Sequence, residues 1–177
     1  MHQVDQERLR DKLADYVEDA HALEEGVVDN LDTMVGTVDD PKLKEVLQRH
    51  RQVSRQHVER LKQRLEQLER GTPVRKRIEG MALALMKGVS DVLRTDAAGK
   101  VGRDAYLLAH TQVAAYELLG RLAESAGDTK TAELAREHLA EDKRCAEEIS
   151  EQWDGFFELT ISSWRDKAAE KTSAATV

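Results

Sequence analysis

Hydrophobic residues recur every three or four positions along most of the chain, which is the spacing of one face of an α-helix. The first such stripe runs from Leu9 to Met34 and predicts a long helix over 4–35. Runs of alternating β-branched residues, which would indicate strands, are nearly absent. The pattern therefore predicts an all-α fold. The other predicted helices cover, in chain order, 41–70, 73–93, 101–125 and 129–156.

Two short polar turns divide these helices into pairs. Asp40 before Pro41 is a typical N-cap followed by a first-turn proline, and Asp128 predicts a second N-cap. Long helices joined by such short turns pack as antiparallel hairpins. About 30 residues, with their own helix over 73–93, separate the two hairpins and can return along a second helix about 40 Å long. Two hairpins with one long crossover predict a ferritin-like four-helix bundle rather than a simple up-down bundle.

The length of 177 residues suits one domain, which we place over 1–160. The remainder, 161–177, ends in small polar residues and is expected to be a partly disordered C-terminal tail. The only cysteine, Cys145, lies on an inward stripe, which is typical of a small buried residue rather than a catalytic thiol. A single cysteine also excludes an intrachain disulfide.

Composition and charge narrow the function classes. Charged residues make up 34% of the chain and the net charge is −7, which argues against a general nucleic-acid binder. The N-terminus is charged, and no apolar run approaches the length of a membrane-spanning helix. We therefore expect a cytoplasmic protein that binds neither nucleic acid nor membrane. Gly-rich phosphate loops, HExxH motifs and nucleophile elbows are absent, so the sequence predicts no catalytic residue and does not favour an enzyme.

Several polar residues lie on the inward stripes, where a carboxylate is costly unless something compensates it. Glu24, for example, stands between Ala20 and Val27. A metal ion is one compensation, and a hydrogen-bonded histidine or glutamine is another. The inward polar residues are Glu24, His50, His57, Gln112, His138, Glu141 and Asp142.

The segment "LQRHRQVSRQHVERL" (47–61) holds two of these residues, His50 and His57. Seven residues of helix rise about 10.5 Å, whereas each ligand lies only about 2.1 Å from its metal. At most one of the two histidines can therefore serve a given site. We favour His57, because the hairpin places it level with His21 and one turn from Glu24. His50 is expected to be a hydrogen-bonded core or boundary residue.

The residues in four segments resemble the YciF-like ferritin-like proteins, which are bacterial stress-associated proteins of unknown function. The likeness covers about 8–155 and rests on "YVEDAHALEEGVVDNLDTM", "LQRHRQVSRQHVERLKQRLEQL", "AHTQVAAYELLGRLAESAGDTKTAELA" and "LAEDK". The resemblance implies a four-helix ferritin-like bundle with extra crossover helices, commonly dimeric, and in many members a di-metal carboxylate centre. The positions of that centre would be Glu24, Val53, His57, Ala109, Gln112 and Glu141.

The sequence departs from that centre at three of its acidic positions. Val53 and Ala109 offer no ligand atom, and Gln112 offers no charge. A di-iron centre of this kind uses about four carboxylates and two histidines. The resemblance therefore implies a degraded di-metal site that a hydrogen-bonded network fills.

Two functions stay open at this point. The first is a stress-associated bundle without catalysis or cofactor, which acts through its surface or as an oligomer. The alternative is a protein that binds one iron, manganese or zinc ion, since carboxylate and imidazole ligands suit these metals. The residues that would hold this ion are Glu24, His57 and Glu141, with help from His21 or Asp142.

Aromatic residues gather near the C-terminus in "WDGFFELTISSW". Trp153, Phe156, Phe157 and Trp164 are four of the seven aromatic residues in the chain. Some should cap the bundle, and the others would form an apolar patch of the kind that marks protein contacts. We therefore predict a homodimer, with this segment or the helix over 73–93 at the interface. Other protein partners stay unknown from the sequence.

Overall fold

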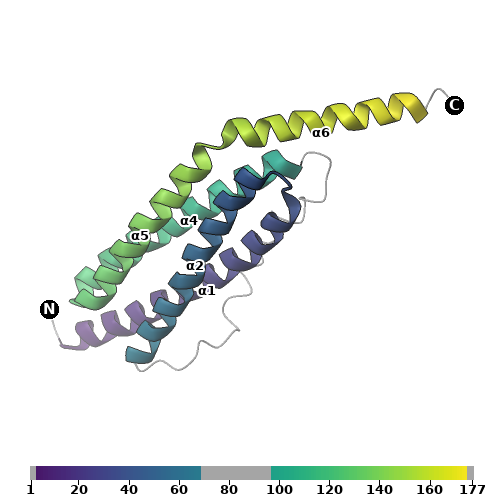
Figure 1. Ribbon diagram of the computed structural model, residues 1–177. Helices are drawn as coiled ribbons and strands as arrows, with labels where there is room; N and C mark the ends of the chain where they lie inside the picture. The colour runs from purple at the N-terminus through teal and green to yellow at the C-terminus, as the bar shows by residue number, and fades with distance from the viewer. Residues whose placement is uncertain (1–2, 69–96, 175–177) are drawn as a thin grey trace.

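The computed structural model describes residues 3–68 and 97–174, and these residues form helices joined by short turns (Figure 1). Strands are absent from these two ranges, which confirms the prediction of an all-α protein. The predicted helix over 73–93 lies outside the described residues. The helices are α1 (Gln3–Thr37), α2 (Pro41–Gln67), α4 (Ala97–Ala126), α5 (Thr129–Ser150) and α6 (Trp153–Ala174).

Four of these helices pack side by side as two hairpins, one made of α1 and α2 and the other of α4 and α5. Contacts between the hairpins join α1 to α4 and α2 to α5. Figure 1 shows that α2 and α4 run in the same direction, with the end of α2 and the start of α4 at opposite ends of the bundle.

Both predicted N-caps are present at the starts of the second helix of each hairpin. The Asp40 carboxylate accepts hydrogen bonds from the backbone N–H groups of Lys42 and Leu43, each at 2.9 Å. The Asp128 carboxylate accepts from the backbone N–H of Thr131 at 3.0 Å. Such a cap stabilises a helix by about 1 kcal/mol. Gly127, with φ at 70°, makes the reversal before the second cap, in a region where glycine is favoured.

The apolar core forms two clusters. One lies toward the α1–α2 turn and includes Leu31 and Leu47, and the other lies toward the opposite end and includes Leu13 and Leu61. The predicted inward stripes supply most of both clusters, and Cys145 is buried as expected. Buried polar residues from the middle of the four helices, such as Glu24, His57 and Asp142, lie between the two clusters. The core therefore has a polar layer with apolar packing above and below it.

The last predicted helix differs from the observed structure. A single helix over 129–156 was expected, but α5 ends at Ser150 and α6 begins at Trp153. Trp153, expected inward, is 39% exposed, and Phe156 is buried instead. Residues 161–174, expected in a partly disordered tail, continue α6, which extends past the bundle in Figure 1.

Two glycines of α4 let α6 approach closely. A Cβ atom at Gly102 would lie 2.7 Å from ring carbons of Phe156, and one at Gly99 would lie 2.8 Å from Thr160 Oγ1. These distances are too short for any side chain larger than hydrogen. The first half of α6 is therefore fixed against the start of α4.

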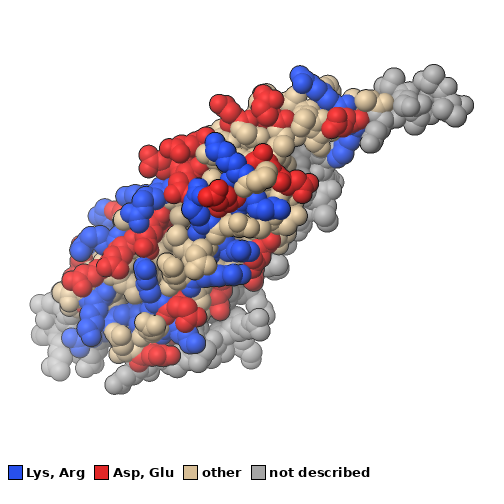
Figure 2. Space-filling view, viewed as in Figure 1, with Lys and Arg blue, Asp and Glu red and all other residues tan. Residues whose placement is uncertain are grey.

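The surface agrees with the charge balance of the sequence. Figure 2 shows basic and acidic side chains intermingled on the visible face, without a continuous basic area among the coloured residues. None of the helices described is long and apolar enough to cross a membrane.

Candidate metal centre

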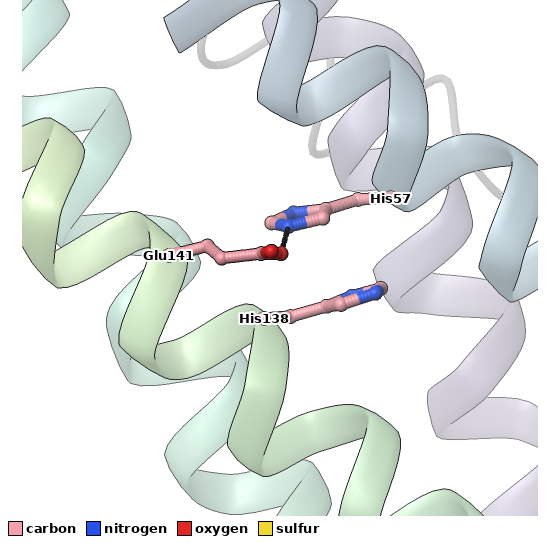
Figure 3. A group of neighbouring side chains, drawn as sticks. All are labelled: His57, His138 and Glu141. Carbon is pink, nitrogen blue, oxygen red and sulfur yellow. Dashed lines mark hydrogen bonds and ion pairs between the residues drawn. The ribbon is translucent and has the colours of Figure 1, made fainter.

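His57 of α2 lies at the centre of the polar layer and is fully buried. Its Nδ1 is 3.0 Å from Glu24 Oε1 on α1, and its Nε2 is 2.8 Å from Glu141 Oε2 on α5. Figure 3 shows the contact with Glu141. Both ring nitrogens face carboxylate oxygens, and the two contacts are hydrogen bonds either when the imidazole carries two protons or when one carboxyl group is protonated and donates to the ring. His57 thus joins three helices through hydrogen bonds to two acidic side chains.

Glu24 is also fully buried, and other helices supply the partners of its two oxygens. Besides the His57 contact, Oε1 accepts a hydrogen bond from the Tyr116 hydroxyl at 2.6 Å, and Oε2 accepts from Gln112 Nε2 at 2.7 Å. Burial, and then the nearby charge of Glu24, raises the pKa of Tyr116 well above its usual value. Tyr116 therefore remains a hydrogen-bond donor to Glu24.

Gln112 connects this carboxylate to His50 on α2. Its Nε2 also donates to Ser54 Oγ at 3.0 Å, and its Oε1 lies 2.7 Å from His50 Nε2. Burial lowers the pKa of His50, so that its neutral ring donates from Nε2 to the amide oxygen. The structure confirms that His50 is a hydrogen-bonded core residue. It also shows that the Gln112 oxygen, which carries no charge, accepts a hydrogen bond from His50.

Asp142 and His138 of α5 complete the layer without hydrogen-bond partners of their own. Both Asp142 oxygens and both His138 nitrogens are buried and lack such a partner. The nearest basic group to Asp142 is His57, whose Nδ1 lies 3.6 Å from Asp142 Oδ1. The His138 ring stacks on the His57 ring, with centroids 3.7 Å apart and planes at 10° (Figure 3).

The environment favours the neutral forms of both residues. Burial, followed by the charges of Glu24 and Glu141, raises the pKa of Asp142 to about 9. Burial, followed by the charges of His57 and Arg60, lowers the pKa of His138 to about 2. Around neutral pH the chain therefore holds a protonated carboxyl group and a neutral imidazole beside the His57 ring.

Two sets of potential ligand atoms share His57. One set is His57, His138 and Glu141, and the other is Glu24, His57 and Asp142, with the atoms of each set within 4.8 Å of one another. Ligand atoms about 2.1 Å from one ion can lie up to about 4.2 Å apart, so a small inward movement would bring either set into range. The four unpartnered polar atoms of Asp142 and His138 also need an explanation in a folded protein. The residues therefore fit a divalent metal ion with carboxylate and imidazole ligands.

The structure brings together four of the five predicted ligands. Glu24, His57, Glu141 and Asp142 meet in the polar layer, whereas His21 belongs to neither ligand set. His21 is buried, and its Nδ1 lies 3.6 Å from Glu25 Oε2 at the edge of α1.

His138 is the ligand candidate that the sequence did not single out as one. The signal was its position on α5, three residues before Glu141 and four before Asp142, which places all three side chains on neighbouring parts of one helix face. The His138 ring also packs edge to face against the Tyr116 ring, with centroids 4.9 Å apart.

Solved structures that share this fold include three proteins of low sequence identity. A protein from Xanthomonas campestris is 22% identical, with a TM-score of 0.73 over 89% of this chain and 99% of that one. The Escherichia coli stress protein YciF is 19% identical, with a TM-score of 0.71 over 85% of this chain and 97% of that one. YcfI from Rhodopseudomonas palustris is also 19% identical, with a TM-score of 0.68 over 85% and 98%.

The family assignment rests on the sequence. No curated protein matches the chain. A family model matches residues 8–159, which include every residue of the candidate metal centre. The match agrees with the resemblance to YciF-like proteins that the sequence motifs indicate. The chain therefore belongs to the family described as "Domain of unknown function (DUF892)".

Proposed function

We propose that this protein is a ferritin-like bundle that binds one divalent metal ion in its polar layer. The ligands would come from Glu24, His57 and Asp142, with His138 and Glu141 beside them. One observation carries the proposal: Asp142 and His138 present four buried polar atoms without hydrogen-bond partners next to His57. Leaving such atoms unpartnered costs about 1–3 kcal/mol for each group, and an ion would remove that cost.

The ligand set supports one ion rather than two. Three carboxylates and two imidazoles are present, one carboxylate fewer than the usual di-iron set. Val53 is half-buried beside the layer and Ala109 is fully buried, but neither has a ligand atom. The Gln112 oxygen is already paired with His50. We therefore regard the centre as a degraded di-metal site that keeps enough ligands for a single iron, manganese or zinc ion.

The chain's own residues would hold such an ion away from water and exchange protons when it binds. Metal ligands must be deprotonated, so Asp142 would lose its proton on binding. A bound ion would supply Lewis-acid or, for iron and manganese, redox chemistry. The resemblance to a protein named as a stress protein supports a role in stress.

Metal analysis tests this function directly. The chelated protein would be reloaded with Fe²⁺, Mn²⁺, Zn²⁺ or Co²⁺, and metal content would be measured by mass spectrometry after gel filtration. We expect about one ion per chain and a higher unfolding temperature with the preferred metal. Asp142→Asn and His138→Phe should lower the affinity at least about tenfold, whereas Glu137→Gln, at an exposed position of the same helix, should not. Content far below one ion for every metal would refute the proposal, and two ions would refute the single-ion site.

A second function, self-association, is supported by a different region. Phe157 and Trp164 on α6 are 60% and 64% exposed, and with Trp153 they follow the spacing of one helix face. We propose that this aromatic stripe of α6 (Trp153, Phe157 and Trp164) packs against the same stripe of a second copy, which gives a homodimer.

The charges along α6 support an antiparallel pairing of the two copies. Exposed Asp154 and Glu158 lie in its first half, and exposed Arg165 lies in its second half. An antiparallel pair centred near Ile161 would place Glu158 of one copy near Arg165 of the other, and Phe157 near Trp164. A twofold axis through this point makes the contact self-complementary. A parallel pair would instead place like charges together.

A further inference from the structure

Glu141 is the one member of the candidate metal centre that reaches solvent. Its side chain is 24% exposed, whereas those of Glu24, His57 and Asp142 are 0% exposed. His138 is fully buried as well. An ion that enters the polar layer from water would therefore meet the Glu141 carboxylate before any other ligand.

Arg60 covers this carboxylate from the outside. It lies three residues after His57 on α2, its side chain is 38% exposed, and its Nη1 donates to Glu141 Oε2 at 3.0 Å. The same oxygen lies 2.8 Å from His57 Nε2. One carboxylate oxygen thus connects a surface guanidinium to the buried imidazole.

We propose that Arg60 and Glu141 form the gate of the metal route, with Arg60 as the residue that controls access. This inference rests on the proposed metal-binding function. An incoming cation must displace the guanidinium from Glu141 Oε2, and it meets the positive charge of Arg60 while it does so. Arg60 therefore slows the entrance of the ion without being a ligand.

The expected size of the effect follows from the position of Arg60. The guanidinium is partly exposed, so water and salt weaken its repulsion of a cation at Glu141. Removing one such charge should speed association about three- to tenfold at low ionic strength. The increase should shrink as salt is added. An exposed ion pair contributes little to stability, so the unfolding temperature should stay close to that of the parent.

The experiment is stopped-flow measurement of Co²⁺ uptake by the chelated full-length protein, followed by the visible absorbance of the bound ion. Arg60→Met should raise the second-order rate constant by the factor given above, and Arg60→Lys should stay near the parent value. Arg55→Met is the matched control, because Arg55 is an exposed arginine of the same helix and pairs with Asp32 instead. It should leave the rate unchanged.

The outcomes separate the gate from the site itself. If the parent takes up no Co²⁺ or other divalent ion, the metal-binding function and the gate are both refuted. If the parent binds Co²⁺ but Arg60→Met leaves its rate unchanged or slower, only the gate is refuted. An equal acceleration by Arg55→Met would refute it too, because the effect would then come from overall charge rather than from the contact with Glu141.

Discussion

Folded proteins usually bury apolar side chains and expose charged ones, and the polar layer and the outer face of α6 depart from this rule in opposite ways. The polar layer buries Glu24 and Asp142 completely in the middle of an apolar core. The α6 face exposes more than half of Phe157 and Trp164 to water. Each arrangement is unfavourable for an isolated chain. We propose that each of these regions takes a partner, a metal ion in the polar layer and a second copy of the chain at α6.

The kind of partner differs between the two regions. Helices α1, α2, α4 and α5 close around the polar layer, so a partner there would have to be as small as an ion. The aromatic stripe of α6 lies on the surface and extends past the bundle, so it can meet a surface as large as another helix (Figure 1). The following predictions test each half of this comparison, beginning with the largest expected effect.

Glu24 should contribute most to stability, because three donors depend on it. Glu24→Ala would leave His57, Gln112 and Tyr116 without their buried carboxylate. We expect a loss of about 3–5 kcal/mol in the free energy of unfolding, measured by urea denaturation. Glu59→Ala, at an exposed position, should change it by less than about 0.5 kcal/mol. A similar loss for both variants would show that the polar layer is not a connected network.

The metal-free protein should become less stable as the pH rises from about 6.5 to about 9. The pKa of Asp142 is raised to about 9 in the folded state and is about 3.9 when unfolded. Between these values the folded state binds the extra proton, so this contribution to stability is lost as the pH rises through about 9.

His138 acts in the opposite direction below about pH 6.5. Its pKa is lowered to about 2 in the folded state, so the unfolded state binds the extra proton as the pH falls below about 6.5. The two contributions offset each other between about pH 4 and 6.5, and only Asp142 acts above it. Above about pH 6.5, the free energy of unfolding measured by urea denaturation should fall by at most about 1.4 kcal/mol per pH unit. The Asp142→Asn substitution should abolish this fall. If the pH dependence persists in this variant, the raised pKa of Asp142 is not its cause.

The aromatic stripe of α6 should determine the oligomeric state and not the fold. Light scattering should report about twice the chain mass of 19.9 kDa for the parent. Phe157→Ser with Trp164→Ser should raise the dimer dissociation constant at least about 30-fold, which corresponds to about 2 kcal/mol of interface energy. Leu118→Ser removes an apolar side chain of α4 that is 50% exposed, and serves as the control.

The point variants are preferable to a truncation after Ser150. Such a truncation would also remove Phe156, which is fully buried against Gly102. The truncation would therefore disrupt the core and remove the proposed interface at the same time. A parent protein that remains monomeric at high concentration would end the proposal of a dimer.

A charge reversal should produce the smallest effect and would settle the direction of the pairing. Glu158→Lys or Arg165→Glu alone should weaken an antiparallel dimer by about 0.2–1 kcal/mol, and the double variant should restore it. Analytical ultracentrifugation at low salt can measure this difference. If the double variant dimerises no better than the single ones, the two α6 helices do not pair antiparallel near Ile161.

Much of the fold could be predicted because its signals are local. Asp40 and Asp128 accept the N-terminal hydrogen bonds of their own helices, and neither contact requires another helix. Helical spacing also identified most of the buried apolar positions, since a helix that packs on one side must repeat its apolar residues at that spacing. Glu24 and His57, both on predicted inward stripes, are fully buried.

The details of the centre depend on distances between helices that no local pattern contains. The hairpin of α1 and α2 predicts that His57 lies level with His21. In the structure, the long side chain of Glu24, one turn further along α1, contacts His57 instead. The break before Trp153 could not be foreseen either. Just after the break, Phe156 fills the space beside Gly102, a contact between α4 and α6 that no local pattern contains.

The positions of the fluorescent residues have a practical consequence. Both tryptophans of the chain, Trp153 and Trp164, lie on α6, whereas the Tyr116 hydroxyl is bonded to Glu24 in the core. Tryptophan emission moves to shorter wavelength as an indole leaves water, and a phenol bonded to a carboxylate emits weakly. The unlabelled protein therefore carries one optical reporter for docking at α6 and another for rearrangement around Glu24. With Tyr116→Phe to identify the tyrosine signal, a single sample could show which of the two events comes first.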